Sequence, residues 1–452
     1  MIMSSGKHLF VLIHGLWGNH KHMKSLNQAF ENVCGQDKNC VFFAPTQNAL
    51  FKTFDGIEIV GYRTLIEICQ YIKEFKEGQI TKISIVGYSM GGLIARFVIG
   101  KMFTEFEQIF KGIEPHLFLT FASPHLGVQF YNPNKSTFKC LLQPILRGVG
   151  SNILGKSGRE LFITNKFNDI LVKLSEGEYL ENLSRFKWRI IFANVKNDRT
   201  VAFYTAYITD CDPFISTENN VKYFFEQKIP GANYSRAPPR IIDIDELDIT
   251  IKRPVFHRPR QYIRWIKIIP LIALFVCFAL PIMFCLNFLA SIYSTVVTKK
   301  YRVTLPDGST SSINYRELGY DDTLKEYFSD FYGSVLNEED DDDDGVNIPE
   351  TDGVSEEQAQ LHMTWKEFTD KYSSNWHKEK KFPRLPFDEK RATILKNLNS
   401  LSWIKIPVYI KSTNAHGGIV ARRGLDENAA STSVACVEFA AQLVQYLLKT
   451  CN

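Results

Sequence analysis

The chain has 452 residues, 45% of them apolar, which is enough for two or three domains or for one domain with large insertions. The formal net charge of +4 is too small to indicate a nucleic-acid-binding protein. The nine cysteines contain no Cys-x-x-Cys pair and indicate reduced thiols, so we expect no disulfide framework.

The first part of the chain alternates predicted strands and helices. His8–Ile13 and Val41–Ala44 are short apolar runs that predict buried strands. Residues 19–33 suit a helix, and residues 56–76 carry apolar side chains at helical spacing on one face. Another strand is predicted over Leu117–Ala122. This alternation predicts an α/β fold, with a mostly parallel sheet and helices on both faces.

The segment from Gly87 to Gly91 contains the pattern Gly-x-Ser-x-Gly, with Ser89 at its centre. Lys82–Val86 before it predicts a strand, and Leu93–Ile99 after it predicts a short helix that ends at Gly100. A strand, a tight turn and a helix are the setting of a nucleophile elbow. Ser89 is therefore the predicted nucleophile, and an ordinary glycine-rich turn is the alternative.

An oxyanion hole needs two backbone N–H groups that converge on one oxygen, and a nearby glycine lets the backbone approach closely. The loop that follows the first strand, His14-Gly15-Leu16-Trp17-Gly18, is in the right place. We predict the N–H groups of Leu16 and Met90 as the two donors, and a structural role for His14. The alternative for this loop is a plain strand-to-loop turn.

A late strand is predicted over Arg189–Val195, and Asp198 lies in the loop after it. A carboxylate there can orient the imidazole of a catalytic triad, so Asp198 is the predicted acid. The alternative is a turn residue or an ion pair with the neighbouring Arg199.

The last strand is predicted over Trp403–Ile410, where Pro407 indicates an edge strand or a bulge. His416 follows it and completes the order serine, acid, histidine of an α/β-hydrolase, so it is the predicted general base. His125 is the rival base, but it precedes Asp198 and would give the wrong order. Val434–Lys449 then predicts a closing amphipathic helix.

Taken together, these motifs resemble those of fungal and plant serine esterases, a lipase-like α/β-hydrolase family. The motifs are His14–Gly18, Gly87–Leu93, Ser123–Gly127, Asn197–Val201 and Asn414–His416. The resemblance covers residues 8 to about 210 and 403 to 449, and within the family it is strongest to the lipid-droplet phospholipases of yeast. It implies a triad of Ser89, Asp198 and His416 and a glycerophospholipid or related acyl-lipid substrate. Ala202 stands where the family often has a proline.

Residues 268–298 form a run without a charged side chain. Pro281 divides it into arms of about a dozen and about sixteen residues, and neither reaches the roughly 20 residues of a spanning helix. The nucleophile and the acid precede the run and the base follows it, so a single span would separate them. Basic residues flank both ends, which indicates that both ends face the cytosol. We predict a membrane hairpin, with a buried helical pair as the alternative.

The remaining segments give weaker signals. Residues 130–158 suit either a substrate-facing cap or a packed satellite cluster. Residues 212–260 are rich in proline and charge and predict a linker with little fixed structure. Residues 301–305 and 312–315 flank a turn and predict a β-hairpin, and the acidic run 338–344 predicts a solvated loop without a metal site. A helix is predicted over 387–401.

These predictions divide the chain into a hydrolase core at 1–210 and 403–452 and an insertion at 211–402. We predict a serine hydrolase, without metal or cofactor, that cleaves acyl esters of glycerophospholipids through an acyl-enzyme. Its expected partners are the lipid substrate and a membrane or lipid-droplet surface, with no nucleic acid. Its expected location is the lipid droplet or the endoplasmic reticulum membrane, with the catalytic domain facing the cytosol. The alternatives are acylglycerols or other carboxylic esters as substrates, or a membrane scaffold without turnover.

Overall fold

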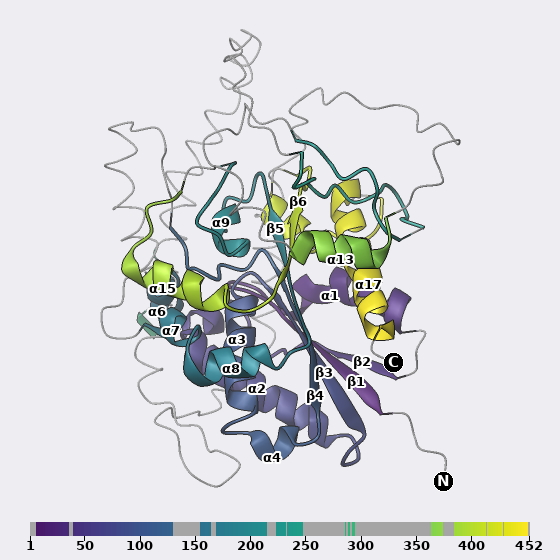
Figure 1. Ribbon diagram of the computed structural model, residues 1–452. Helices are drawn as coiled ribbons and strands as arrows, with labels where there is room; N and C mark the ends of the chain where they lie inside the picture. The colour runs from purple at the N-terminus through teal and green to yellow at the C-terminus, as the bar shows by residue number, and fades with distance from the viewer. Residues whose placement is uncertain are drawn as a thin grey trace, which may run out of the picture.

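The computed structural model describes residues 6–35, 39–129, 154–163, 169–214, 223–231, 233–246, 363–373, 384–412, 414–427 and 429–450, and the single residues 285, 288, 289, 292 and 293. A six-stranded sheet lies at its centre, in the order β2-β1-β3-β4-β5-β6, and every neighbouring pair is parallel (Figure 1). The strands are β1 (Lys7–Ile13), β2 (Cys40–Phe43), β3 (Ile80–Tyr88), β4 (Glu114–Phe121), β5 (Trp188–Asn194) and β6 (Ile404–Val408).

Helices connect the strands, as parallel pairing requires. The long ones are α1 (Lys24–Cys34), α2 (Ile57–Lys73), α3 (Gly91–Met102), α13 (Trp365–Ser373), α15 (Glu389–Leu398) and α17 (Ser431–Lys449). The short ones are η1 (His20–Met23), η2 (Leu50–Phe54), α4 (Glu107–Phe110), α6 (Gly155–Leu161), α7 (Ile170–Lys173), α8 (Gly177–Ser184), α9 (Phe203–Ala206) and α16 (Ala415–Gly418). The predicted alternation of strands and helices is confirmed.

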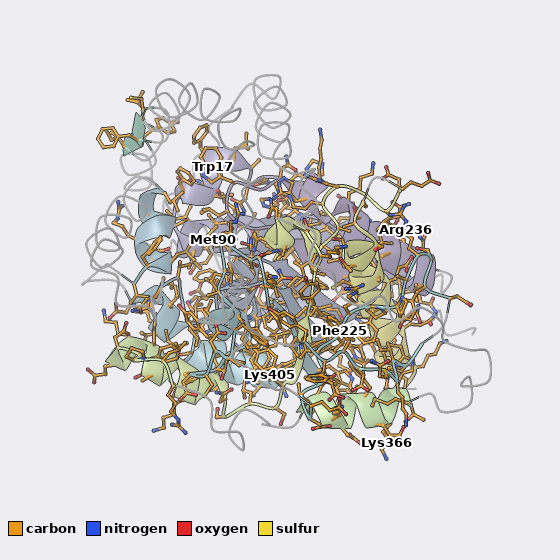
Figure 2. The ribbon with its side chains drawn as sticks, turned by 90° about the horizontal axis from the view of Figure 1, so that it is seen from above. Trp17, Met90, Phe225, Arg236, Lys366 and Lys405 are labelled. Carbon is orange, nitrogen blue, oxygen red and sulfur yellow. The ribbon has the colours of Figure 1, made fainter. Side chains whose placement is uncertain are left out.

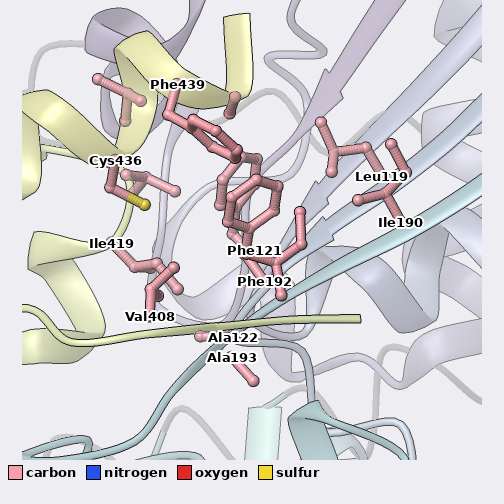
Figure 3. Close-up of a cluster of buried hydrophobic side chains, with 14 of the residues drawn as sticks. Leu119, Phe121, Ala122, Ile190, Phe192, Ala193, Val408, Ile419, Cys436 and Phe439 are labelled. Atoms are coloured by element: carbon pink, nitrogen blue, oxygen red, sulfur yellow. The ribbon is translucent and has the colours of Figure 1, made fainter. Parts of the chain in front are cut away.

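Both faces of the sheet are buried. Successive side chains of a strand point to opposite faces, and in β1 Leu9 and Val11 join one apolar cluster while Phe10 and Leu12 join the other. Helices α2, α3 and α8 cover the first face, and α1 and α17 cover the second (Figure 1). Figure 3 shows the second cluster, where strand residues such as Phe121 and Phe192 pack towards Phe439 of α17. Burial on both faces explains why the strands are nearly continuous apolar runs.

The helix after the elbow continues past the predicted end at Gly100 and reaches Met102. An ideal Cβ at Gly100 would lie 2.0 Å from a ring carbon of Tyr179 on α8. The glycine is therefore needed for the close packing of α3 on α8, and the prediction that it ends the helix was wrong.

The last strand, β6, lies at the edge of the sheet, as Pro407 indicated. Its outer side is covered by residues 240–242, because Tyr409 N–H donates to the carbonyl of Arg240 and Ile242 N–H donates to the carbonyl of Pro407. Ile241 and Ile242 are buried. The prediction of a linker over 212–260 is thus wrong for residues 223–231 and 233–246, which pack on the core.

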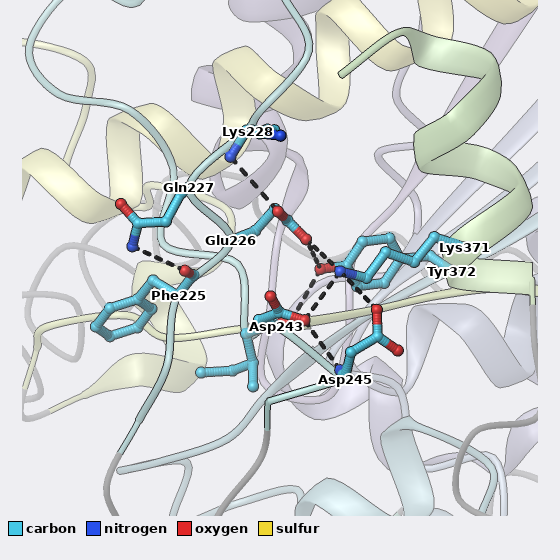
Figure 4. Close-up of polar contacts among 9 residues, drawn as sticks. Phe225, Glu226, Gln227, Lys228, Asp243, Asp245, Lys371 and Tyr372 are labelled. Atoms are coloured by element: carbon cyan, nitrogen blue, oxygen red, sulfur yellow. Dashed lines mark hydrogen bonds and ion pairs between the residues drawn. The ribbon is translucent and has the colours of Figure 1, made fainter. Parts of the chain in front are cut away.

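Helix α13 is joined to the same segment by an ionic cluster (Figure 4). Lys371 Nζ lies 2.6 Å from Glu226, 2.9 Å from Asp243 and 3.1 Å from Asp245. At the start of the same helix, Trp365 packs against Phe439 with ring centroids 5.4 Å apart. Two parts of the predicted insertion are therefore attached to the sheet and to α17.

Several predictions fall on residues outside the described ranges: most of the apolar run 268–298, the hairpin around 306–308 and the acidic loop 338–344. Within the apolar run, Phe288, Leu289, Ile292 and Tyr293 are helical and between 44% and 61% exposed. In the described part of the chain, no helix has the length and apolar character needed to cross a membrane. The hairpin and the domain boundaries at 210 and 403 stay predictions.

Candidate active site

The nucleophile elbow lies at the carboxyl end of β3. Ser89 has a φ of +55°, a left-handed conformation that costs a non-glycine residue free energy. The turn can form because its neighbours lack side chains: an ideal Cβ at Gly91 would lie 2.1 Å from the carbonyl oxygen of Ile13, and one at Gly87 would lie 2.5 Å from Cα of Gly92. The backbone N–H of Ser89 donates to the carbonyl of Phe121 at the end of β4.

The structure brings Ser89, His416 and Asp198 together at the carboxyl ends of β3, β6 and β5. His416 Nε2 lies 2.9 Å from Ser89 Oγ, and His416 Nδ1 lies 2.9 Å from Asp198 Oδ2. Both Ser89 and His416 are buried. With Nδ1 protonated towards the carboxylate, Nε2 is left to accept the proton of the serine hydroxyl.

The Asp198 carboxylate is held by its own loop. Its Oδ1 accepts hydrogen bonds from the backbone N–H groups of Thr200, at 3.0 Å, and Val201, at 2.8 Å. Its Oδ2 accepts one from the Asn194 side chain at 3.1 Å. The Asp198 carboxylate pairs with His416, and among the described residues it forms no ion pair with the exposed Arg199. The alternative of an Asp198–Arg199 ion pair was therefore wrong.

Tyr88 and Asn194 position the histidine, and neither was predicted from the sequence. Tyr88 donates its phenolic hydroxyl to the carbonyl of His416 at 2.9 Å, and the Asn194 amide donates to the carbonyl of Ala415 at 2.9 Å. Asn194 therefore contacts both the acid and the loop of the base. Tyr88 occupies a variable position of Gly-x-Ser-x-Gly and Asn194 lies outside the motifs, and neither contact could be predicted because each joins segments more than 200 residues apart.

The rival base His125 is fully buried and lies elsewhere. Its Nε2 is 3.0 Å from Thr120 Oγ1, and its ring packs near Phe118 and Trp403. Burial lowers its pKa well below the usual value, and nearby Arg96 adds to the effect. His416, and not His125, is hydrogen-bonded to Ser89.

The predicted oxyanion donors lie at the same end of the sheet. An ideal Cβ at Gly15 would be 2.6 Å from Cβ of Ser89 and 3.0 Å from the backbone nitrogen of Met90, so the loop of Leu16 touches the elbow. Figure 2 shows Met90 and Trp17, the residue after Leu16, in the same part of the molecule. Neither Leu16 nor Met90 donates its N–H to another described residue. Both N–H groups are therefore available for an acyl oxygen.

His14 is buried beside this loop, and its Nδ1–H donates to the carbonyl of Gly15 at 3.0 Å. Burial lowers the pKa of His14 to about 4, despite hydrogen bonds that favour its charged form. The imidazole is therefore neutral near pH 7, and its Nδ1–H is bound to the Gly15 carbonyl. This arrangement suits the structural role predicted for His14.

Residues 3–213 match the family described as "Putative serine esterase (DUF676)". The chain is 33% identical over 214 residues to the protein named putative lipase ROG1 of Saccharomyces cerevisiae, covering 46% of this chain and 29% of that protein. It is 28% identical over 215 residues to the putative lipase C4A8.10 of Schizosaccharomyces pombe, covering 45% of this chain and 26% of the other. The aligned region thus spans less than a third of each relative.

Solved structures with some likeness include lipase BlEst2 of Bacillus licheniformis, with 19% identity, a TM-score of 0.27 and coverage of 43% of this chain and 37% of that one. Phospholipase PlaB of Legionella pneumophila has 17% identity, a TM-score of 0.29 and coverage of 44% and 41%. These TM-scores are too low to bear on fold or function. The family match is the informative comparison, because residues 3–213, which it covers, contain both the elbow and the predicted acid.

Proposed function

We propose that this protein is a serine hydrolase that cleaves the acyl esters of glycerophospholipids at a membrane or lipid-droplet surface. The evidence for this type of reaction is the pair of hydrogen bonds that links Ser89 to His416 and His416 to Asp198. A hydroxyl 2.9 Å from an imidazole that is itself held by a carboxylate is the arrangement that activates a serine.

In the proposed reaction, Ser89 Oγ attacks the ester carbonyl while His416 Nε2 takes its proton. Asp198 holds the imidazole and stabilises its charged form. The N–H groups of Leu16 and Met90 donate to the developing oxyanion, and each such donor is worth about 100- to 1000-fold in rate. His416 then protonates the leaving alcohol, and a water molecule, activated in the same way, releases the fatty acid from Ser89.

The substrate class rests on the resemblance of the chain to lipid-droplet phospholipases and on its apolar segment. In that segment Phe288, Leu289, Ile292 and Tyr293 recur at helical spacing and are exposed, an arrangement that suits contact with acyl chains. We propose that residues 268–298 enter one leaflet as a hairpin and hold the active site at the lipid surface. A lipid droplet has a single phospholipid layer, which a hairpin can enter without crossing to a second aqueous side.

The test is release of fatty acid and lysolipid from emulsions that contain both phospholipid and triacylglycerol, by purified wild type and Ser89→Ala. We expect phospholipid cleavage by the wild type and none by the variant. Cleavage of triacylglycerol alone would keep the serine hydrolase and change the substrate class. Cleavage that survives in Ser89→Ala would contradict the assignment of the nucleophile, and inactivity of both proteins would favour the scaffold.

A further inference from the structure

We propose that Thr53 is a positioning residue of the oxyanion hole. The proposal rests on the function proposed above and adds to it a residue that touches neither the triad nor the substrate. Thr53 lies in η2, outside every motif of the sequence, and its side chain is fully buried.

The Thr53 hydroxyl makes two hydrogen bonds that fix its orientation. It accepts the backbone N–H of Trp17 at 3.0 Å and donates to the carbonyl of Leu50 at 2.5 Å. Trp17 directly follows the oxyanion donor Leu16 in the loop. Because the Trp17 N–H belongs to the peptide that follows Leu16, holding this N–H restricts the ψ angle of Leu16 and the φ angle of Trp17.

The two segments joined by this hydroxyl, the oxyanion loop and η2, both carry backbone strain. Trp17 has a φ of +56° and Leu50 a φ of +50°, which side-chain-bearing residues adopt only when surrounding contacts hold them there. A second hydrogen bond joins the same two segments, from the N–H of Leu50 to the carbonyl of Gly18 at 3.1 Å. The Trp17 ring also packs against Phe51 and Phe54, with centroids 4.8 Å and 5.0 Å away. The oxyanion loop is therefore shaped by η2 and not by its own sequence alone.

The backbone of Thr53 is in turn fixed from α6. Ser157 donates its hydroxyl to the carbonyl of Thr53 at 2.6 Å and accepts the N–H of Gly56 at 2.9 Å, and it is fully buried. These bonds support the Thr53 hydroxyl in its position under the oxyanion loop. They also show that α6, at the end of the segment predicted as either cap or satellite cluster, is packed on the core.

Thr53→Val removes the hydroxyl and keeps the shape of the side chain. The N–H of Trp17 then loses its acceptor, and the loop can relax away from φ +56°. A displacement of about 1 Å at a catalytic group costs on the order of 100-fold in rate, so we expect kcat to fall about 10- to 100-fold. KM should change less than about threefold, because the loop acts on the charged transition state more than on the bound ester. Thr53→Ser keeps the hydroxyl and should restore kcat to within about threefold of the wild type.

The matched control is Thr205→Val. Thr205 is equally buried and makes the same pair of bonds, accepting the N–H of Leu126 and donating to the carbonyl of Gly127, each at 2.9 Å, but in α9. We expect both valine variants to lose stability, because each loses two buried hydrogen bonds. Thr205→Val should nevertheless keep its kcat within about threefold of the wild type.

The experiment measures kcat and KM of the full chain for a soluble p-nitrophenyl ester, and the inhibition constant of a trifluoromethyl ketone. The ketone forms a tetrahedral adduct with the serine whose oxyanion occupies the hole, so its inhibition constant should rise in Thr53→Val by about the factor that kcat falls. An unchanged kcat, equal losses in the valine and serine variants, or an unchanged inhibition constant would each overturn the proposal. Loss of ester cleavage in Ser89→Ala tests the proposed function separately, and a wild type without turnover would refute both.

Discussion

The ionic cluster around Lys371 joins α13 to the segment that contains Glu226 and Asp243. We predict that the loss of this cluster destabilises the folded protein. Lys371→Met removes the charged group, whose Nζ also lies 5.9 Å from the centre of the Tyr372 ring, and keeps most of the length of the side chain. Burial alone would lower the pKa of Lys371, but its hydrogen bonds to Glu226, Asp243 and Asp245 outweigh burial and raise it. The charged lysine is therefore a stabilising partner in the folded protein.

The magnitude follows from the exposure of each partner. The side chain of Lys371 is 17% exposed and that of Glu226 only 6%, whereas Asp245 is 70% exposed and contributes little. Removing one partner of a buried pair costs about 3–5 kcal/mol, because a charge is left behind without compensation. The partial exposure of Lys371 reduces this value, so we expect the free energy of unfolding to fall by about 2–3 kcal/mol.

Urea unfolding, followed by tryptophan fluorescence, measures this loss, because Trp365 lies on the same helix and packs on α17 through Phe439. Lys366→Met, an exposed position of the same helix, is the control and should change the free energy by less than about 0.5 kcal/mol. Combining Lys371→Met with Glu226→Gln should cost less than the sum of the single changes. A loss below about 0.5 kcal/mol for Lys371→Met, or strict additivity, would refute the reasoning.

Two further predictions concern the acid and a buried carboxyl. Asp198→Asn should lower kcat for a p-nitrophenyl ester about 10³- to 10⁴-fold with little change in KM, because an amide does not hold the imidazole in the productive tautomer; a fall below tenfold would argue against Asp198 as the acid. Burial raises the pKa of Glu160 from 4.5 to about 7, although Lys156 and the N–H of Ile57 favour its charged form. Because the folded pKa lies above the usual one, the stability that Glu160 contributes is complete below about pH 4.5 and is lost as the pH rises through 7. Glu160→Gln should therefore raise the free energy of unfolding by about 3 kcal/mol at pH 8 and leave it unchanged near pH 4, and equal effects at both values would contradict this sign.

The parts of the fold that the sequence predicted are those encoded by local patterns. The apolar runs of β1, β3, β4 and β5 are buried on both faces of a parallel sheet, so each one is readable within a few residues. The elbow was readable because its steric requirements allow only small residues at Gly87 and Gly91. The association of His416 with Ser89 followed from the order of the motifs, since the carboxyl ends of parallel strands meet at one edge.

What the sequence did not reveal depends on contacts between distant segments. Asn194, Tyr88 and Thr53 each make hydrogen bonds across loops, and no periodicity or spacing marks such residues. The segment 240–244 contains three isoleucines and two charged residues in a proline-rich neighbourhood, so its pairing with the edge strand was hidden by the composition around it. Gly100 indicated the end of a helix by its residue type, but Tyr179 is what requires it.

The central claim is that His416 activates Ser89, and covalent labelling tests it most directly. The full chain is treated with a fluorophosphonate, and the modified residue is mapped by mass spectrometry in the wild type, Ser89→Ala and His416→Ala. We expect a single label on Ser89 in the wild type, none at that position in Ser89→Ala, and labelling slowed at least about 100-fold in His416→Ala. Labelling of His416→Ala at the wild-type rate, or no labelling of a folded wild type, would contradict it.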